Sequence, residues 1–174
     1  EKRTTLTYGL DVSKTIFRFI GLQSALGNVF QIASEETCLW SDVLELYMEV
    51  LESHLGYRPK VILQDLDSFL EWRTSKYQVL YDRLYNRRFS AKRISRYVDI
   101  NSFTKVNTGL RDCLVTFLQD PNFNADAINW KREALKDLVS GQKTPLKEIP
   151  GYKEKIKYFL YRHGIKKFLA IFHC

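Results

Sequence analysis

Two aspartates, Asp11 and Asp65, are the residues whose type and position best suit a chemical role. Each follows a run of residues that we interpret as a β-strand, so each carboxylate would stand at a strand end. If the two strands lie parallel and adjacent, both carboxylates meet at one sheet edge, where hard oxygen ligands can hold magnesium. Two such ions about 4 Å apart activate water and stabilise a leaving phosphate oxygen. The pair therefore predicts a site for Mg²⁺ or Mn²⁺ that supports phosphoryl transfer.

The strands that must position these carboxylates are predicted from short runs of apolar and β-branched residues. Alternation of apolar with small or polar residues indicates a strand that ends near Asp11, and an unbroken apolar run indicates a buried strand before Asp65. Two β-rich runs between them are joined by a connection short enough for a hairpin. The predicted strands are 6–10, 15–22, 28–33 and 61–63.

The rest of the sequence has mainly helical periodicity. Helices are predicted over 41–55, 108–118, 125–139 and 152–163, one long or two short helices over 68–85, and a last strand over 165–172. The range 89–100 has mixed periodicity. The predicted fold class is α/β (α+β), a mixed sheet of about four to six strands covered by helices. We expect one domain over residues 1–174, with a strand-rich acidic half (1–65) and a helix-rich basic half (66–174), as part of a longer protein.

The strand order β-β-β-α-β and two short motifs resemble the ribonuclease H-like superfamily, which includes integrases and transposases. The run YGLDVS at 8–13 is similar to the first-strand motif of some members, and PKVILQD at 59–65 is similar to the strand of integrases that carries the second aspartate. The resemblance covers about residues 4–118. It implies a ribonuclease H-like sheet, Asp11 and Asp65 as catalytic residues and metal ligands, and activity as a divalent-metal-dependent nuclease or strand transferase.

The chain departs from that family at the third catalytic position. Integrases place a glutamate about thirty-five residues after the second aspartate, and here the position falls on Asn101. A domain that keeps the fold and has lost the chemistry therefore fits as well as an active nuclease. Simpler roles also remain open: Asp11 as an ordinary strand-end residue, Asp65 with Asp67 as a helix-entry cap, and Asn101 as part of a helix cap.

A second candidate feature is a cluster of cations in the basic half. Residues 1–82 carry a formal charge of −4 and residues 83–174 carry +11. Six cations fall within fourteen positions, interleaved with the rings of Tyr81, Tyr85, Phe89 and Tyr97. Arginines suit phosphate backbones and exposed rings can stack on bases, although the same pattern also describes solvated helix faces with core aromatics. The predicted nucleic-acid-binding residues are Arg83, Arg87, Arg88, Lys92, Arg93 and Arg96.

Composition narrows the classes of function. No run approaches the roughly 18–20 apolar residues of a membrane span, three widely spaced cysteines suggest no disulfide framework, and the motifs of nucleotide-driven motors and of serine hydrolases are absent from the sequence. We therefore expect an intracellular protein, nuclear or cytoplasmic, that makes no membrane contact. The leading hypothesis is a nucleic-acid-binding domain of a mobile-element, viral or genome-maintenance protein. The alternative is a protein-protein interaction module that binds an acidic or apolar partner surface.

Overall fold

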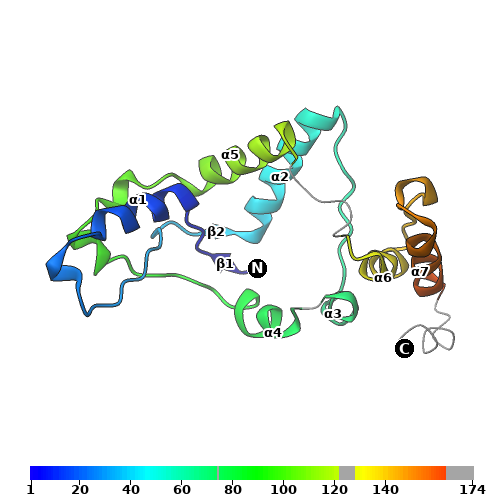
Figure 1. Ribbon diagram of the computed structural model, residues 1–174, viewed down its shortest axis with the longest axis horizontal. Helices are drawn as coiled ribbons and strands as arrows, with labels where there is room; N and C mark the ends of the chain where they lie inside the picture. Colours follow the sequence, from blue (N-terminus) through cyan, green and yellow to red (C-terminus); the bar gives the residue numbers. More distant parts are fainter. Residues whose placement is uncertain (74, 122–127, 164–174) are drawn as a thin grey trace. The chain divides into compact units, whose positions relative to one another are not determined.

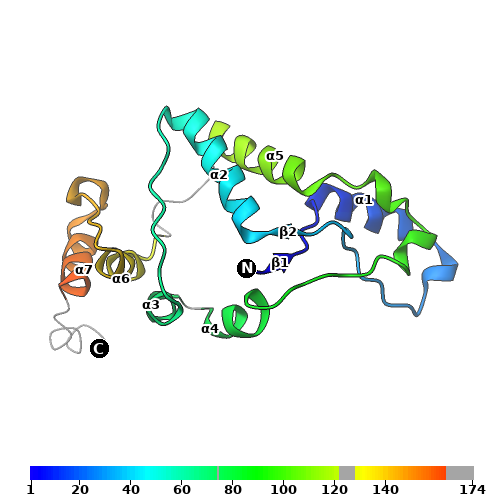
Figure 2. The same ribbon diagram turned by 180° about the vertical axis from the view of Figure 1, so that it is seen from behind.

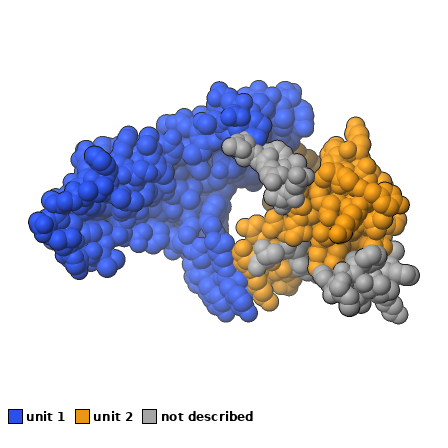
Figure 3. Space-filling model, in the orientation of Figure 1, with its two compact units in different colours: residues 1–59, 77–121 blue, residues 60–76, 122–174 orange. Residues whose placement is uncertain are grey.

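The computed structural model describes residues 1–73, 75–121 and 128–163 and shows a predominantly helical protein. The chain forms two compact units: unit 1 holds residues 1–59 and 77–121, and unit 2 holds residues 60–76 and 122–174 (Figure 3). Among the described residues the sheet has only two strands. The predicted mixed sheet of four to six strands, and with it the ribonuclease H-like topology, is therefore wrong.

The small sheet and the first helix replace three of the predicted strands. Strand β1 (Arg3–Thr4) pairs antiparallel with β2 (Cys38–Leu39), with Thr4 opposite Cys38. Helix α1 (Gly9–Phe19) covers residues 9–10 of the first predicted strand and 15–19 of the second, and 28–33 is irregular. Periodicity cannot separate short apolar runs in helices from those in strands. Here Asp11 in the first turn and Arg18 in the last suit the helix dipole.

Helices α2 (Trp40–Leu55) and α5 (Val106–Gln119) pack side by side in unit 1 (Figures 1 and 2). The Leu39 amide donates a 2.9 Å hydrogen bond to Asp42 Oδ2 at the start of α2, which ends at the left-handed Gly56. Both helices were predicted. Gly109 in α5 allows the Tyr8 ring to pack closely against this helix, because a Cβ at position 109 would lie 3.0 Å from Tyr8 Cδ2.

The range 89–103 forms a small hydrophobic core in unit 1. Its 3₁₀ turns are η3 (Ile94–Arg96) and η4 (Ile100–Ser102), and a further turn, η1 (Gln23–Ala25), follows α1. The buried members of this core all come from the range 89–103 and are Ala91, Ile94, Val98 and Phe103. The partly buried residues that pack against them are Phe19 of α1, Ile32 of the loop that follows, and Tyr97 and Ile100 of the range itself.

The range 68–85 was predicted to form one long helix or two short ones. The structure shows the second alternative: a short helix and then a second one that continues as a π-helical turn. Helix α3 (Leu66–Trp72) lies in unit 2, and α4 (Lys76–Gln78) runs into a π-helical turn, η2 (Val79–Arg83). Residues 61–63 before α3 are irregular, so the buried strand predicted there is wrong as well. The run is too short to decide between a strand and a connection by periodicity.

Unit 2 is built around a helical hairpin. Helix α6 (Trp130–Ser140) begins where Asn129 Oδ1 accepts a hydrogen bond from the Arg132 amide, and it packs against α7 (Tyr152–Arg162). The connection between them contains the 3₁₀ turn η6 (Leu146–Glu148). The core of the hairpin consists of Trp130, Ala134, Ile149 and Tyr158. Both helices were predicted, whereas the strand predicted over 165–172 lies outside the described residues.

Candidate nucleic-acid interface

Each of the three predicted catalytic residues takes part in a hydrogen bond between a side chain and the backbone. Asp11 is buried in the first turn of α1, where its Oδ2 accepts a 2.7 Å hydrogen bond from the Thr104 amide. Asp65 caps α3 by accepting hydrogen bonds from the Ser68 amide (2.9 Å) and hydroxyl (2.7 Å). Both bonds lower the pKa of Asp65, and the bond from the Ser68 amide has the larger effect. The Asn101 amide donates to Asp99 Oδ1, so Asp99 is the cap of η4.

These positions do not fit the predicted metal site. No strand ends at Asp11 or Asp65, so the shared sheet edge that motivated the site does not exist, and the two residues belong to different units. Within the described ranges no group of three or more His, Cys, Asp or Glu side chains is placed to hold a metal ion. We therefore derive no chemical step through Mg²⁺ or Mn²⁺.

Two of the six predicted nucleic-acid-binding cations are engaged inside unit 1. Arg87 contacts Asp82 Oδ1 at 3.0 Å and also donates to the Thr4 hydroxyl of β1. Arg83 lies over the Trp40 ring, 5.1 Å from its centroid, and 3.6 Å from Asp82 Oδ2. These arginines connect the segment after α4 to β1 and α2, and the structure therefore gives them a structural role.

The other four cations are exposed and form a region that we call the basic segment, residues 88–96. Its apolar residues Ala91 and Ile94 point into the core, because they are spaced three residues apart and continue to Val98 four residues later. The residues between them are left at the surface. The exposed cations are Arg88, Lys92, Arg93 and Arg96.

Charge in the basic segment is not neutralised by its neighbours. Among the described residues none of its four cations forms an ion pair with a carboxylate. Arg93 lies 5.9 Å from the Phe30 ring centroid and donates to Asn28 Oδ1 at 3.4 Å, both neutral partners. Glu35 instead accepts a 3.0 Å hydrogen bond from the Ala91 amide, so this carboxylate fixes the backbone beneath the cations.

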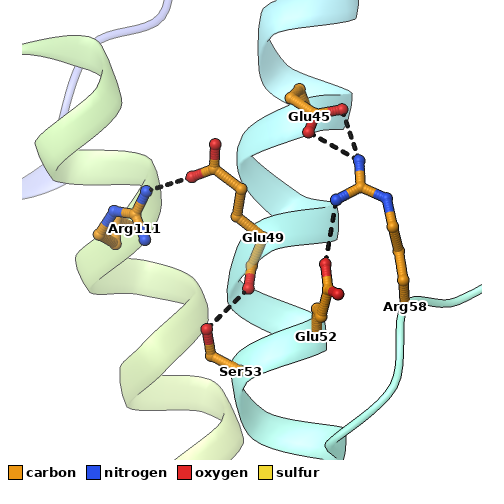
Figure 4. A network of polar contacts seen from close by, with 6 residues as sticks. All are labelled: Glu45, Glu49, Glu52, Ser53, Arg58 and Arg111. Atoms are coloured by element: carbon orange, nitrogen blue, oxygen red, sulfur yellow. Dashed lines mark hydrogen bonds and ion pairs between the residues drawn. The ribbon is translucent and has the colours of Figure 1, made fainter.

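The arginines beside α2 have the opposite environment (Figure 4). Arg58 Nη2 lies 2.7 Å from both carboxylate oxygens of Glu45, and its Nη1 lies 3.1 Å from Glu52 Oε2. Arg111 Nη2 of α5 lies 2.8 Å from Glu49 Oε2. The Arg111 contact joins α5 to α2, the Arg58 contacts join α2 to the segment that follows it, and both cations are neutralised.

The aromatic residues predicted to stack on bases divide into two groups. Tyr97 belongs to the core: its ring packs against Phe19 and Phe30, and its hydroxyl donates to the Ser24 carbonyl at 3.2 Å. Tyr81, Tyr85 and Phe89 are exposed. Phe89, next to Arg88, is therefore the exposed ring that lies within the basic segment.

Positive charge is concentrated in unit 2, although fewer of its cations cluster in one short segment. Counted on the sequence, unit 2 has 14 Lys or Arg against 8 Asp or Glu, whereas unit 1 has 13 against 12. Lys157 is paired with Glu154 at 3.4 Å, and Arg162 donates to the Gln142 carbonyl. The excess in unit 2 is thus spread over a helix pair and its loop.

A cavity of about 90 Å³ lies between the start of α1 and the start of α5. Tyr8, Gly9, Lys105 and Cys113 are among its lining residues. It is well below the roughly 300–1,000 Å³ of ordinary small-molecule sites. The basic segment is accordingly the stronger candidate for a functional site.

Comparison of the chain with protein-family models, with curated proteins and with solved structures gave no match. Within the part of the chain that the structure describes, no helix combines the length and apolar character needed to cross a membrane. Function is therefore argued from the surface of the molecule itself.

Proposed function

We propose that this protein binds the phosphate backbone of a nucleic acid through the basic segment. The observation that carries the proposal is that Arg88, Lys92, Arg93 and Arg96 are exposed and have no carboxylate partner among the described residues. Phosphates provide the missing negative charge, and guanidinium groups can contact them through two parallel hydrogen bonds.

The rigidity of the underlying backbone also supports the proposal. Ala91 and Ile94 are each 1% exposed, and the Ala91 amide is fixed by Glu35. A segment held in this way loses little backbone freedom when it binds, so less of the interaction energy is spent on ordering. Phosphate contacts position a protein on nucleic acid without reading its bases. We therefore expect binding that depends strongly on salt and weakly on sequence.

The test is fluorescence anisotropy with labelled single-stranded and duplex DNA and RNA at several salt concentrations. Four phosphate contacts predict that affinity falls on the order of 10²-fold between about 50 and 200 mM salt. A triple variant, Arg88→Ala with Lys92→Ala and Arg96→Ala, should bind about tenfold more weakly or worse at low salt, with a smaller salt slope.

Two further variants make the test specific. Ser90→Asp keeps an acceptor for the Lys92 amide, now 3.3 Å from Ser90 Oγ, and adds a carboxylate beside Lys92 and Arg93; it should weaken binding several-fold. Arg58→Ala with Arg111→Ala removes two cations that are already paired, and it should leave affinity nearly unchanged. Absence of binding at low salt, or equal losses in the triple variant and in this control, would refute the proposal.

A further inference from the structure

Helix α1 shows an inverted pattern of burial. Its most buried residues are polar: Asp11 is 6% exposed and Thr15 is 1% exposed. Phe19 packs into unit 1, but four other large apolar residues face solvent. They are Leu10 (52% exposed), Ile16 (53%), Phe17 (75%) and Ile20 (74%), the last of these being the C-cap. A surface helix ordinarily turns its apolar stripe toward the core, so this face lacks a partner among the described residues of unit 1.

Contacts at both ends of the helix fix this orientation. Asp11 is bonded to the Thr104 amide at the first turn. At the last turn, the Phe19 ring stacks on Phe30 with a centroid distance of 4.8 Å and packs against Tyr97 at 5.4 Å. The helix cannot roll to bury its apolar side chains without breaking these contacts. The exposed face is therefore a fixed feature of unit 1.

Spacing along α1 places the apolar residues in one stripe with a charged edge. At about 100° per residue, Leu10 and Phe17 lie nearly above one another, and Ile20 continues the stripe beside them. Lys14 and Arg18, one turn apart, form the neighbouring row and are both exposed. Neither cation is ion-paired within the described ranges, and the one carboxylate of α1 is the buried Asp11. The face thus combines apolar area with one uncompensated positive edge.

We propose that this face of α1 binds an acidic amphipathic helix of a partner protein. Apolar side chains of such a helix, repeated every three or four residues, would cover Leu10, Phe17 and Ile20. Its flanking carboxylates would pair with Lys14 and Arg18, which gives charge complementarity along one edge. The face shares no residue with the basic segment, so separate variants test the two binding activities.

Two other occupants fit the face less well. A second copy of this chain offers an acidic stripe on α2, but Glu45, Glu49 and Glu52 are already paired with Arg58 and Arg111. An anionic membrane is bound best by a helix whose whole polar face is rich in Lys and Arg. In α1 the cations line one edge, while the opposite side, represented by Phe19, packs into unit 1.

The probe is a labelled three-heptad peptide with leucine and isoleucine at positions a and d and glutamate at the flanking positions. Its matched partner has lysine in place of every glutamate. We expect the whole protein to bind the glutamate peptide at least tenfold more tightly than the lysine peptide. Phe17→Asp and Ile20→Asp should each weaken this binding about tenfold or more, because each places a charge within the apolar contact. Tyr57→Asp, at a residue 63% exposed elsewhere in unit 1, should not weaken it.

A charge reversal gives the sharpest result. Lys14→Glu with Arg18→Glu should abolish binding of the glutamate peptide and create binding of the lysine peptide. Equal affinity for the two peptides, no binding below about 1 mM, or a preference that the reversal does not exchange would overturn the proposal.

Two outcomes would reassign the face to another occupant and would also overturn the proposal. One is dimerisation of the chain in sedimentation that Phe17→Asp abolishes. The other is stronger binding to phosphatidylserine vesicles than to the peptide. The triple variant of the basic segment should still bind the glutamate peptide, and Phe17→Asp should still bind nucleic acid, so failure of one proposal is distinguishable from failure of the other.

Discussion

Carboxylates are satisfied in opposite ways on α2 of unit 1 and in the α6–α7 hairpin of unit 2. On α2 the three glutamates are exposed and are paired with arginines (Figure 4). In the hairpin Asp137 is buried, and its Oδ2 accepts three hydrogen bonds from neutral donors. The donors are the Tyr158 hydroxyl (2.7 Å), the Thr144 hydroxyl (2.7 Å) and the Thr144 amide (2.8 Å).

The difference shows which contacts hold the fold and which set surface charge. Exposed ion pairs are screened by water and salt and contribute little to stability. A buried carboxylate that accepts hydrogen bonds from three donors is costly to remove, because those donors lose this acceptor. The basic segment is a third case, in which no cation has a carboxylate partner among the described residues and Arg93 has only neutral partners. Its charge is therefore available for a ligand.

Removal of Asp137 is expected to give the largest effect. Asp137→Ala would leave the Tyr158 hydroxyl and the Thr144 amide without this acceptor, and we expect unit 2 to lose about 1–3 kcal/mol of unfolding free energy. Chemical denaturation monitored by hydrogen exchange within the α6–α7 hairpin measures this loss. Glu148→Ala, at an exposed position in the connection between α6 and α7, is the control. Equal stability of the two variants would show that the Asp137 contacts do not hold the hairpin.

The pH dependence of unit 2 tests the same contacts without a large structural change. Burial alone would raise the pKa of Asp137, but the hydrogen bonds from Tyr158 and Thr144 outweigh burial and lower it. A lowered folded-state pKa means that this stabilisation is complete above the unfolded value, about 3.9, and is lost as pH falls through the folded value. In Asp137→Asn the unfolding free energy of the hairpin should therefore fall less steeply as the pH is lowered. An acid limb identical to that of wild type would contradict this assignment.

Several helices could be predicted from the sequence because their signals are local. Gly56 marks the left-handed end of α2, and α7 shows the periodicity of an amphipathic helix. Helix α1 was mistaken for strands because its apolar residues do not face the core. Its inner side is set by the Asp11–Thr104 hydrogen bond, which joins residues 93 positions apart. No local pattern contains that information.

The candidate site was predictable in part for the same reason. The spacing of Ala91, Ile94 and Val98 indicates which side of the basic segment is buried, and hence that Lys92 and Arg96 are exposed. That Arg87 is occupied could not be read from the cluster, because one of its partners, Thr4, lies 83 positions away. Counting cations locates a basic region, but the distant partners decide which of them are free.

The smallest effect is expected from a variant that frees one paired arginine of the surface from its carboxylates. Glu45→Gln with Glu52→Gln removes both carboxylate partners of Arg58 and should tighten nucleic-acid binding about two- to threefold at low salt, with a salt slope steeper by up to one contact. Asp112→Asn with Asp120→Asn is the matched control. It raises the net charge equally at exposed positions without releasing an arginine. Anisotropy titrations of both variants distinguish a freed guanidinium from a general gain of charge. If the control gains as much as the glutamate variant, net charge alone governs binding, and the pairing state of individual arginines carries no information about the interface.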